Sequence, residues 1–83
     1  MTHMNIDVEI KRKNGWFIAE SKQIPGLFVC EKSYDEAYRI VPKVIAALIK
    51  VQHNQTVDVI EKKFDAGKST AVSPIHFEAK EAA

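Results

Sequence analysis

Residues 21–38, SKQIPGLFVCEKSYDEAY, place a turn, an apolar strand and a helix start directly after one another. Pro25 presets the second turn position, and Gly26 supplies the positive φ that the third position of a type II turn requires. The apolar run LFVC predicts a strand over residues 27–32 that is covered on both faces. We therefore interpret the stretch as a packing device, in which a strand folds back so that a helix can cover it.

The helix that follows is signalled by Ser33, which forms a capping box with Glu36. Asp35 adds negative charge near the positive end of the helix dipole. Apolar residues recur at helical spacing through residue 52, and Asn54 suits a left-handed cap. The apolar positions cover roughly half of the helix circumference, which is more than one sheet face requires and predicts a second contact.

Pro42 lies inside this helical pattern. A proline there removes one backbone hydrogen bond and costs about 3 kcal/mol. The apolar periodicity nevertheless resumes on the same face after it. We expect one kinked helix, with two short helices as the alternative.

Two strands are predicted upstream of the turn. Residues 5–13 alternate apolar and polar side chains, which is the period of a half-buried strand. The dipeptide Asn14-Gly15 follows, and it is typical of a two-residue type I′ hairpin because both positions need positive φ. The second strand is then expected over residues 16–22, with Lys13 opposite Trp16.

This register assigns each side chain of the hairpin to a face, because directly opposed residues share a face. The residues expected on the core face are Ile6, Val8, Ile10, Phe17 and Ala19. Trp16 and Ile18 fall on the other face, beside Lys11 and Lys13. Large apolar groups on an uncovered face mark an interface, although Trp16 could also lie over the lysine stems at the hairpin end.

The rest of the chain predicts one more strand and a tail. Residues 56–64 alternate again, whereas residues 65–83 read as a carboxy-terminal tail or arm that becomes ordered only against a partner. The expected fold class is α+β, a small antiparallel sheet with one long helix on one face in the order β-β-β-α-β. Residues 1–64 would form the domain.

The length and the cysteine content limit how such a chain can be stabilised. A chain of 83 residues buries a small core and often needs a disulfide, a metal or an oligomer. Cys30 is the only cysteine, and the histidines at positions 3, 53 and 76 are far apart and lack thiolate partners. Oligomerisation remains as the expected means of stabilisation.

Charge and hydropathy exclude several classes of protein. A net charge of +1 does not indicate a strongly basic nucleic-acid binder or an acidic tail. No apolar run approaches the ~18 residues of a membrane span, and the amino terminus lacks a signal-peptide core. We expect a cytoplasmic protein with a reduced thiol, which starts at Met1 or at Met4.

No catalytic, metal or cofactor site is predicted. Cys30 lies mid-strand among apolar neighbours, where we expect it to be packed in the core and inert. Ser33 is a helix cap without a strained Gly-x-Ser-x-Gly turn, and the glycines form no phosphate loop. His76 is the one histidine that we single out for mutation. An enzyme with a site shared across an oligomer is the least supported alternative.

Basic residues suggest a second class of function. Three of them crowd the first hairpin beside Trp16 and Phe17, where they could neutralise a nucleic-acid strand or protect an edge strand from aggregation. Three more form the solvated stripe of the helix. The possible nucleic-acid contacts are Lys11, Arg12, Lys13, Arg39, Lys43 and Lys50.

The segments NGWFIAES, IPGL and SYDEAYRIVPKVIAALI, in this order, resemble the HicB-like antitoxin superfamily and, within it, a small branch of uncharacterised bacterial domains. The resemblance covers residues 6–54 and includes the helix proline. The matching residues are Trp16, Ala19, Glu20, Ser21, Ile24, Pro25, Gly26, Leu27, Ser33, Val41, Pro42, Ile45 and Leu48.

The resemblance implies a partial RNase H-like fold without metal-binding carboxylates, homo-oligomers, and masking of HicA, a small toxin that cleaves messenger RNA. Many HicB-like proteins add a carboxy-terminal DNA-binding domain. The segment after residue 64 is too short for a helix-turn-helix and does not resemble a ribbon-helix-helix, so operator binding is not expected of it.

We therefore expect a non-enzymatic, HicB-like protein that forms homo-oligomers and binds a protein partner, with antitoxin activity as the specific hypothesis. A small nucleic-acid-binding module and a solitary oligomeric domain are the alternatives. The expected interface residues are Trp16, Ile18, Phe28, Ile75 and Phe77.

Overall fold

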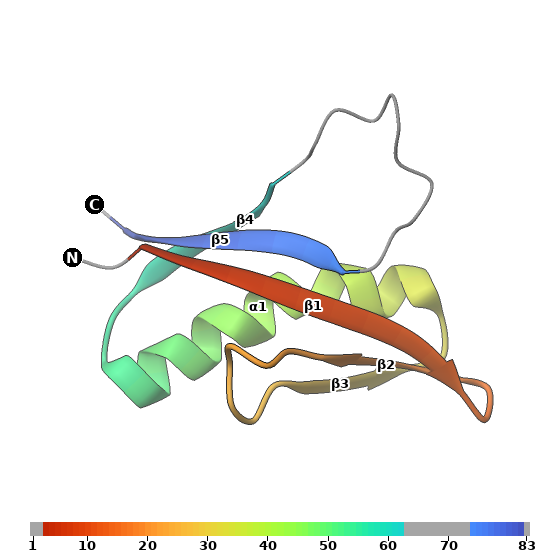
Figure 1. The fold of residues 1–83 in the computed structure, drawn as a ribbon. Helices are drawn as coiled ribbons and strands as arrows, with labels where there is room; N and C mark the ends of the chain where they lie inside the picture. The colour runs from red at the N-terminus through yellow and green to blue at the C-terminus, as the bar shows by residue number, and fades with distance from the viewer. Residues whose placement is uncertain (1–2, 63–73, 83) are drawn as a thin grey trace.

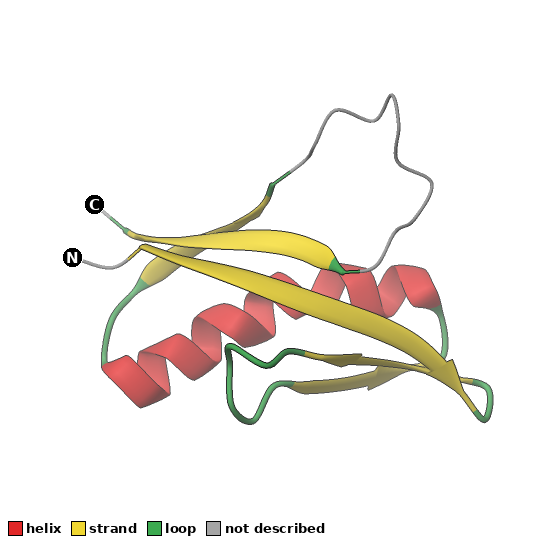
Figure 2. Cartoon of the chain, in the orientation of Figure 1, coloured by secondary structure: helices red, strands yellow, loops and turns green. Residues whose placement is uncertain are grey.

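The computed structural model describes residues 3–62 and 74–82. In these residues one long helix lies against one face of an antiparallel sheet, so the expected α+β class is confirmed (Figures 1 and 2). The elements are β1 (His3–Lys13), β2 (Trp16–Glu20), β3 (Phe28–Glu31), α1 (Tyr34–His53), β4 (Val57–Glu61) and β5 (Ile75–Glu81). The strands form one sheet in the order β3-β2-β1-β5-β4.

The β1–β2 hairpin has the register expected from its turn. Lys13 pairs with Trp16, and the pairing continues to Glu9 and Glu20. Asn14 and Gly15 have φ values of 53° and 83°, as a type I′ turn requires. Local turn chemistry is therefore sufficient to decide which side chains of the hairpin share a face.

The second turn connects β2 to β3 as expected and also contacts the helix. Gly26 has φ of 88°, and the Leu27 N–H donates to the Ile24 carbonyl at 3.1 Å. The Gln52 side-chain amide donates to the Pro25 carbonyl at 2.7 Å, which ties the turn to the last turns of α1.

The expectation that β3 is covered on both faces is wrong. Leu27 and Val29 are buried, but Phe28 and Cys30 are exposed. The physical reason is that a single helix covers a single face of the sheet, and alternate residues of the strand point away from it. Cys30 is therefore a surface thiol in this chain and not a core residue.

Helix α1 begins and ends at the expected caps. The Glu36 N–H donates to the Ser33 hydroxyl at 3.1 Å. At the other end, Asn54 is left-handed and its N–H donates to the Lys50 carbonyl at 2.9 Å. The helix is continuous through Pro42, which confirms one helix rather than two.

The expected order β-β-β-α-β lacks a strand that the structure contains. Residues 75–81, assigned above to a tail or arm, form β5, and β5 lies between β1 and β4. Pairing with β2 occupies only residues 9–13 of β1, on one of its edges. Residues 3–8 of β1 pair on the other edge with β5. Residues 65–73 and residue 83 of the expected tail lie outside the described residues.

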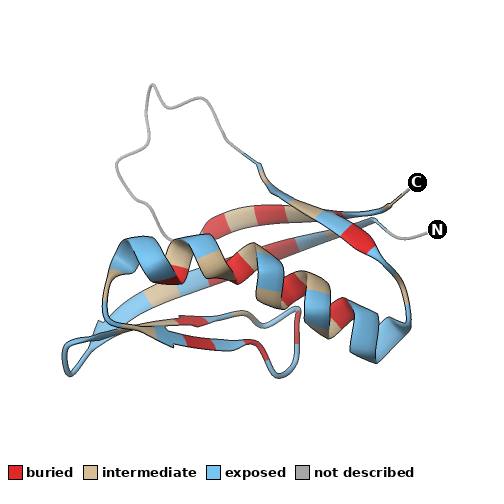
Figure 3. Ribbon diagram, turned by 180° about the vertical axis from the view of Figure 1, so that it is seen from behind, coloured by how far each residue is buried: buried red, intermediate tan, exposed pale blue. Residues whose placement is uncertain are grey.

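The core lies between α1 and the inner face of the sheet, where buried positions recur along both layers (Figure 3). The face assigned to the first hairpin is confirmed, because Ile6, Val8 and Ala19 are fully buried and Ile10 and Phe17 pack against them. The core residues are Ile6, Val8, Ala19, Ile24, Leu27, Val29, Ala37, Val41, Ile45, Ile49, Val57, Ile75, Phe77 and Ala79.

Candidate functional site

The outer face of the sheet, opposite α1, carries an exposed apolar group at the β2–β3 end. We call Trp16, Ile18, Phe28 and Cys30 the outer apolar surface. Trp16 is 40% exposed and Phe28 is 59% exposed. The group is contiguous because Ile18 pairs directly with Cys30 across β2 and β3.

A shallow hollow of about 480 Å³ lies over this surface. The four apolar residues line it together with polar neighbours of both signs, namely Lys11, Lys13, Asn14 and Glu20. An apolar floor with a charged rim is the composition of a protein interaction surface. Trp16, Ile18 and Phe28 therefore lie together, as the sequence suggested.

The other two expected interface residues are not on this surface. Ile75 and Phe77 are 8% and 3% exposed, because they lie on the inner face of β5 opposite Val8 and Ile6. Assigning them to an interface was wrong. The apolar–polar alternation of IHFEAKE is the sequence signal that would have identified this strand.

Lysines gather around Trp16. The Lys32 ammonium lies 5.3 Å from the centre of the Trp16 ring, within the range of a cation–π contact. Lys11 lies on the same face and pairs with Glu9 at 3.5 Å. Lys32 has no distinguishing signal in the sequence, and its proximity to Trp16 follows from the β2–β3 register.

The six basic residues proposed for nucleic-acid contact do not form one surface. Lys11 and Lys13 lie on the outer face, whereas Arg12 lies on the helix side with its guanidinium carbon 5.8 Å from the Phe17 ring centre. The helix residues Arg39, Lys43 and Lys50 are exposed on the opposite layer. Arg39 is paired with Asp35 at 2.9 Å.

The β1–β5 half of the outer face is polar. Asp7 accepts a hydrogen bond from His76 at 2.6 Å, directly across the two strands. His3 contacts Glu78 diagonally, because Glu78 itself lies opposite Asn5. The hydrogen bond from His3, helped by the charges of Lys80 and Lys62, lowers the pKa of the Glu78 carboxyl. His76, singled out in the sequence, thus joins β1 to β5, and its partner Asp7 was not foreseen.

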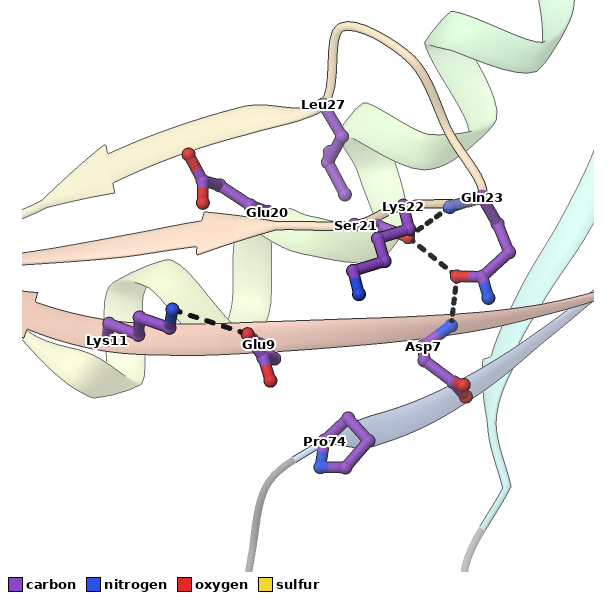
Figure 4. Close-up of a pocket in the computed structure, with 9 residues that line it drawn as sticks. All are labelled: Asp7, Glu9, Lys11, Glu20, Ser21, Lys22, Gln23, Leu27 and Pro74. Carbon is purple, nitrogen blue, oxygen red and sulfur yellow. Dashed lines mark hydrogen bonds and ion pairs between the residues drawn. The ribbon is translucent and has the colours of Figure 1, made fainter.

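A second hollow, of about 520 Å³, lies beside the turn after β2 (Figure 4). The Gln23 side-chain oxygen accepts from the Asp7 N–H at 3.0 Å and from the Ser21 hydroxyl at 3.1 Å. Gln23 thereby supplies an acceptor for a backbone N–H of β1 at a position that β2 no longer reaches. The remaining lining residues are Glu9, Lys11, Glu20, Lys22, Leu27 and Pro74.

This second hollow does not have the chemistry of an active site. Its carboxylates and ammonium groups are mixed, so it favours neither an anion nor a cation. The Ser21 hydroxyl is engaged with Gln23, and the lining includes no histidine that could activate it. The hydrogen bonds of Gln23 at this hollow connect the residues after β2 to β1.

Two negative findings concern the described residues. No cluster of three or more histidine, cysteine, aspartate or glutamate side chains there is arranged to hold a metal ion. No helix there is both long and apolar enough to pass through a bilayer. Comparisons of the chain with family models, with curated proteins and with solved structures found no significant match.

Proposed function

We propose that this chain is a non-enzymatic, HicB-like interaction protein that associates through its outer apolar surface. The observation that carries the proposal is the exposure of Trp16 and Phe28, 40% and 59%, on the one sheet face that α1 does not cover. Aromatic anchors of this kind contribute most of the binding free energy in protein interfaces. Contiguous exposed apolar patches with a polar rim mark protein interaction sites.

The specific function proposed is that of an antitoxin in a type II toxin–antitoxin system, in the cytoplasm. The support is the resemblance of NGWFIAES, IPGL and the proline-containing helix to the HicB-like pattern, together with an α+β fold that has one helix on one sheet face. The partner would be a HicA-like, messenger-RNA-cleaving toxin. Masking would bury the toxin's active surface against Trp16 and its neighbours.

The test is binding and growth rescue with the product of a small basic reading frame next to the gene. We expect the parent chain to bind it and to restore growth, and Trp16→Ala to weaken binding by at least about 2 kcal/mol. Ile60→Ala is the matched control, because Ile60 is 51% exposed on the opposite edge strand. Equal binding by the parent and Trp16→Ala would remove this surface from the proposal.

A nucleic-acid-binding module is the second candidate, and one observation favours it. Lys32 lies over the exposed Trp16 ring, and Lys11 and Lys13 line the same hollow. The ring could stack on a base while the lysines neutralise phosphates. Binding to single-stranded RNA should then fall steeply with salt and weaken in Lys13→Gln. An absence of binding at low salt would exclude this candidate.

A further inference from the structure

The free edge of β3 is the feature that carries a further inference. Among the described strands, β3 is at the end of the sheet and pairs only with β2. Its exposed side chains are Phe28 and Cys30, both apolar. The opposite edge strand, β4, also exposes an apolar residue, Ile60, but it carries the exposed charge of Asp58 on the same face. Charges protect an edge strand from pairing with another chain. Within β3 both exposed side chains are uncharged, and the exposed Lys32 follows directly after the strand.

The backbone direction of β3 follows from one hydrogen bond in β1. The Asp7 N–H donates to Gln23, which follows β2 in the chain, so Asp7 turns its backbone groups to the β2 side. Backbone directions alternate along a strand, and Glu9 therefore faces β2 as well. Its partner Glu20 returns these hydrogen bonds.

The same alternation passes through β2 to the free edge. Because Glu20 faces β1, its neighbour Ala19 faces β3, and its partner Val29 faces back toward β2. The N–H and C=O groups of Phe28 and Cys30 are then directed away from the sheet. Within the part of the chain that the structure describes, this edge presents an apolar outer face and backbone groups without a partner strand at the same residues.

We propose that a second copy of this chain pairs with this edge, antiparallel, about a two-fold axis through Cys30. The two sheets become one continuous sheet, with Cys30 opposite the partner's Cys30 and Phe28 opposite the partner's Lys32. This inference rests on the proposed function, since it names a self-partner for the edge strand that carries Phe28 and Cys30 of the outer apolar surface.

Register and face select this axis. Outer-face residues of one copy must lie opposite outer-face residues of the other, so the axis passes through a residue and not between two. An axis at Cys30 pairs Cys30 with its own copy and the outward-facing Phe28 with Lys32, the residue that directly follows β3. An axis at Val29 leaves Lys32 unpaired.

The charges around this edge are complementary in that register. Glu20 lies beside Phe28 on β2, and Lys32 lies over the Trp16 ring. Pairing places each Lys32 next to the partner's Phe28, with the partner's Glu20 one strand further, about 10 Å away by strand spacing. The two long side chains can close that distance. The two-fold axis repeats the arrangement, and no like charges are opposed.

The first test uses a proline that removes only an outward-facing N–H. Proline is tolerated in an edge strand where its nitrogen faces away from the sheet. The parent chain should be a dimer at micromolar concentration in light scattering after size-exclusion chromatography. Cys30→Pro should weaken dimerisation by at least about tenfold. Cys30→Ser, which keeps the N–H, should remain a dimer.

The second test is covalent trapping, which does not depend on the folding of the proline variant. Opposed Cα atoms about 5.5 Å apart in a hydrogen-bonded pair lie within the range of a disulfide. Diamide takes up two electrons and two protons as two thiols join, so oxidised parent chain should run as a covalent dimer in a non-reducing gel. The matched control is Cys30→Ser with Asp58→Cys, an exposed thiol on the opposite edge, which should stay largely uncrosslinked.

The outcomes separate this inference from the function on which it rests. If the chain dimerises without Cys30 crosslinks, and Trp16→Ala dissociates it while Cys30→Pro does not, edge pairing is wrong and association through the outer face stands. A chain that stays monomeric at micromolar concentration also overturns edge pairing, and the toxin-binding assay then decides the proposed function alone. A monomeric Cys30→Pro and a trapped parent dimer would support the inference even if no toxin binds.

Discussion

Phe28 and Phe77 were assigned the same role from the sequence, and they lie in opposite environments. Phe77 is 3% exposed on β5, whereas Phe28 is 59% exposed on β3. Each is flanked along its strand by residues that point to the other face. The comparison teaches that the identity of an aromatic residue does not decide its role in a small sheet. The face covered by the single helix decides it.

The two residues also differ in their direct neighbours. Phe77 lies opposite Ile6 on β1, which is itself fully buried. Phe28 lies opposite Glu20, an exposed carboxylate. Burial of Phe77 therefore contributes to folding, while Phe28 remains available to a second molecule.

The largest difference is expected when the side chains of Phe28 and Phe77 are each truncated to alanine. Phe77→Ala should lower the free energy of unfolding by about 3–5 kcal/mol, because it leaves a cavity between sheet and helix. Phe28→Ala in the monomer should change it by less than about 0.5 kcal/mol. Urea unfolding at a concentration below the association range measures both. Similar losses for the two variants would contradict the comparison.

A smaller effect is expected at the start of α1, the helix that covers the inner face of the sheet. Ser33→Ala removes the acceptor of the Glu36 N–H and should cost about 1 kcal/mol. The loss should appear in urea unfolding and leave association through Trp16 unchanged. A change in association without a change in stability would mean that Ser33 belongs to the outer surface.

The polar half of the outer face should contribute less. Asp7→Asn removes the charge opposite His76, a half-exposed cross-strand pair, and should cost below about 1 kcal/mol. Thermal unfolding at two salt concentrations measures the loss, which should shrink at high salt. A loss as large as that of Phe77→Ala would show that this pair, rather than the core, holds β5 in place.

The smallest expected effect concerns the contact between Tyr38 and Glu61 on the inner side of β4, and it appears only at alkaline pH. A hydrogen bond to the Glu61 carboxylate, with burial and the Glu61 charge, raises the pKa of Tyr38 to about 12. The unfolded chain ionises near the ordinary value of 10.0, so this stabilisation is complete below pH 10 and is lost as pH rises toward 12. Ultraviolet titration should show a late tyrosine transition that Tyr38→Phe lacks. A tyrosine transition completed near pH 10 would argue against the contact.

Much of the fold could be predicted because its signals are local. The Asn14-Gly15 turn sets the hairpin register, and Ser33 and Asn54 set the helix ends, through contacts within a few residues. The outer location of Trp16 followed from that register alone. These predictions depend on backbone conformation and short-range hydrogen bonds, which the chain carries in its own order.

The errors lie where distant segments meet. Cys30 was expected in the core and Ile75 at an interface, and both assignments were reversed. The sequence by itself determined the turns, the caps, the single helix and the alternation of faces, because each depends on near neighbours. Only the tertiary structure decided that residues 75–80 pair with residues 3–8, and that α1 covers the face holding Phe77 and leaves Phe28 exposed. Such choices depend on the total apolar area that long-range pairing can bury, and no local pattern contains that quantity.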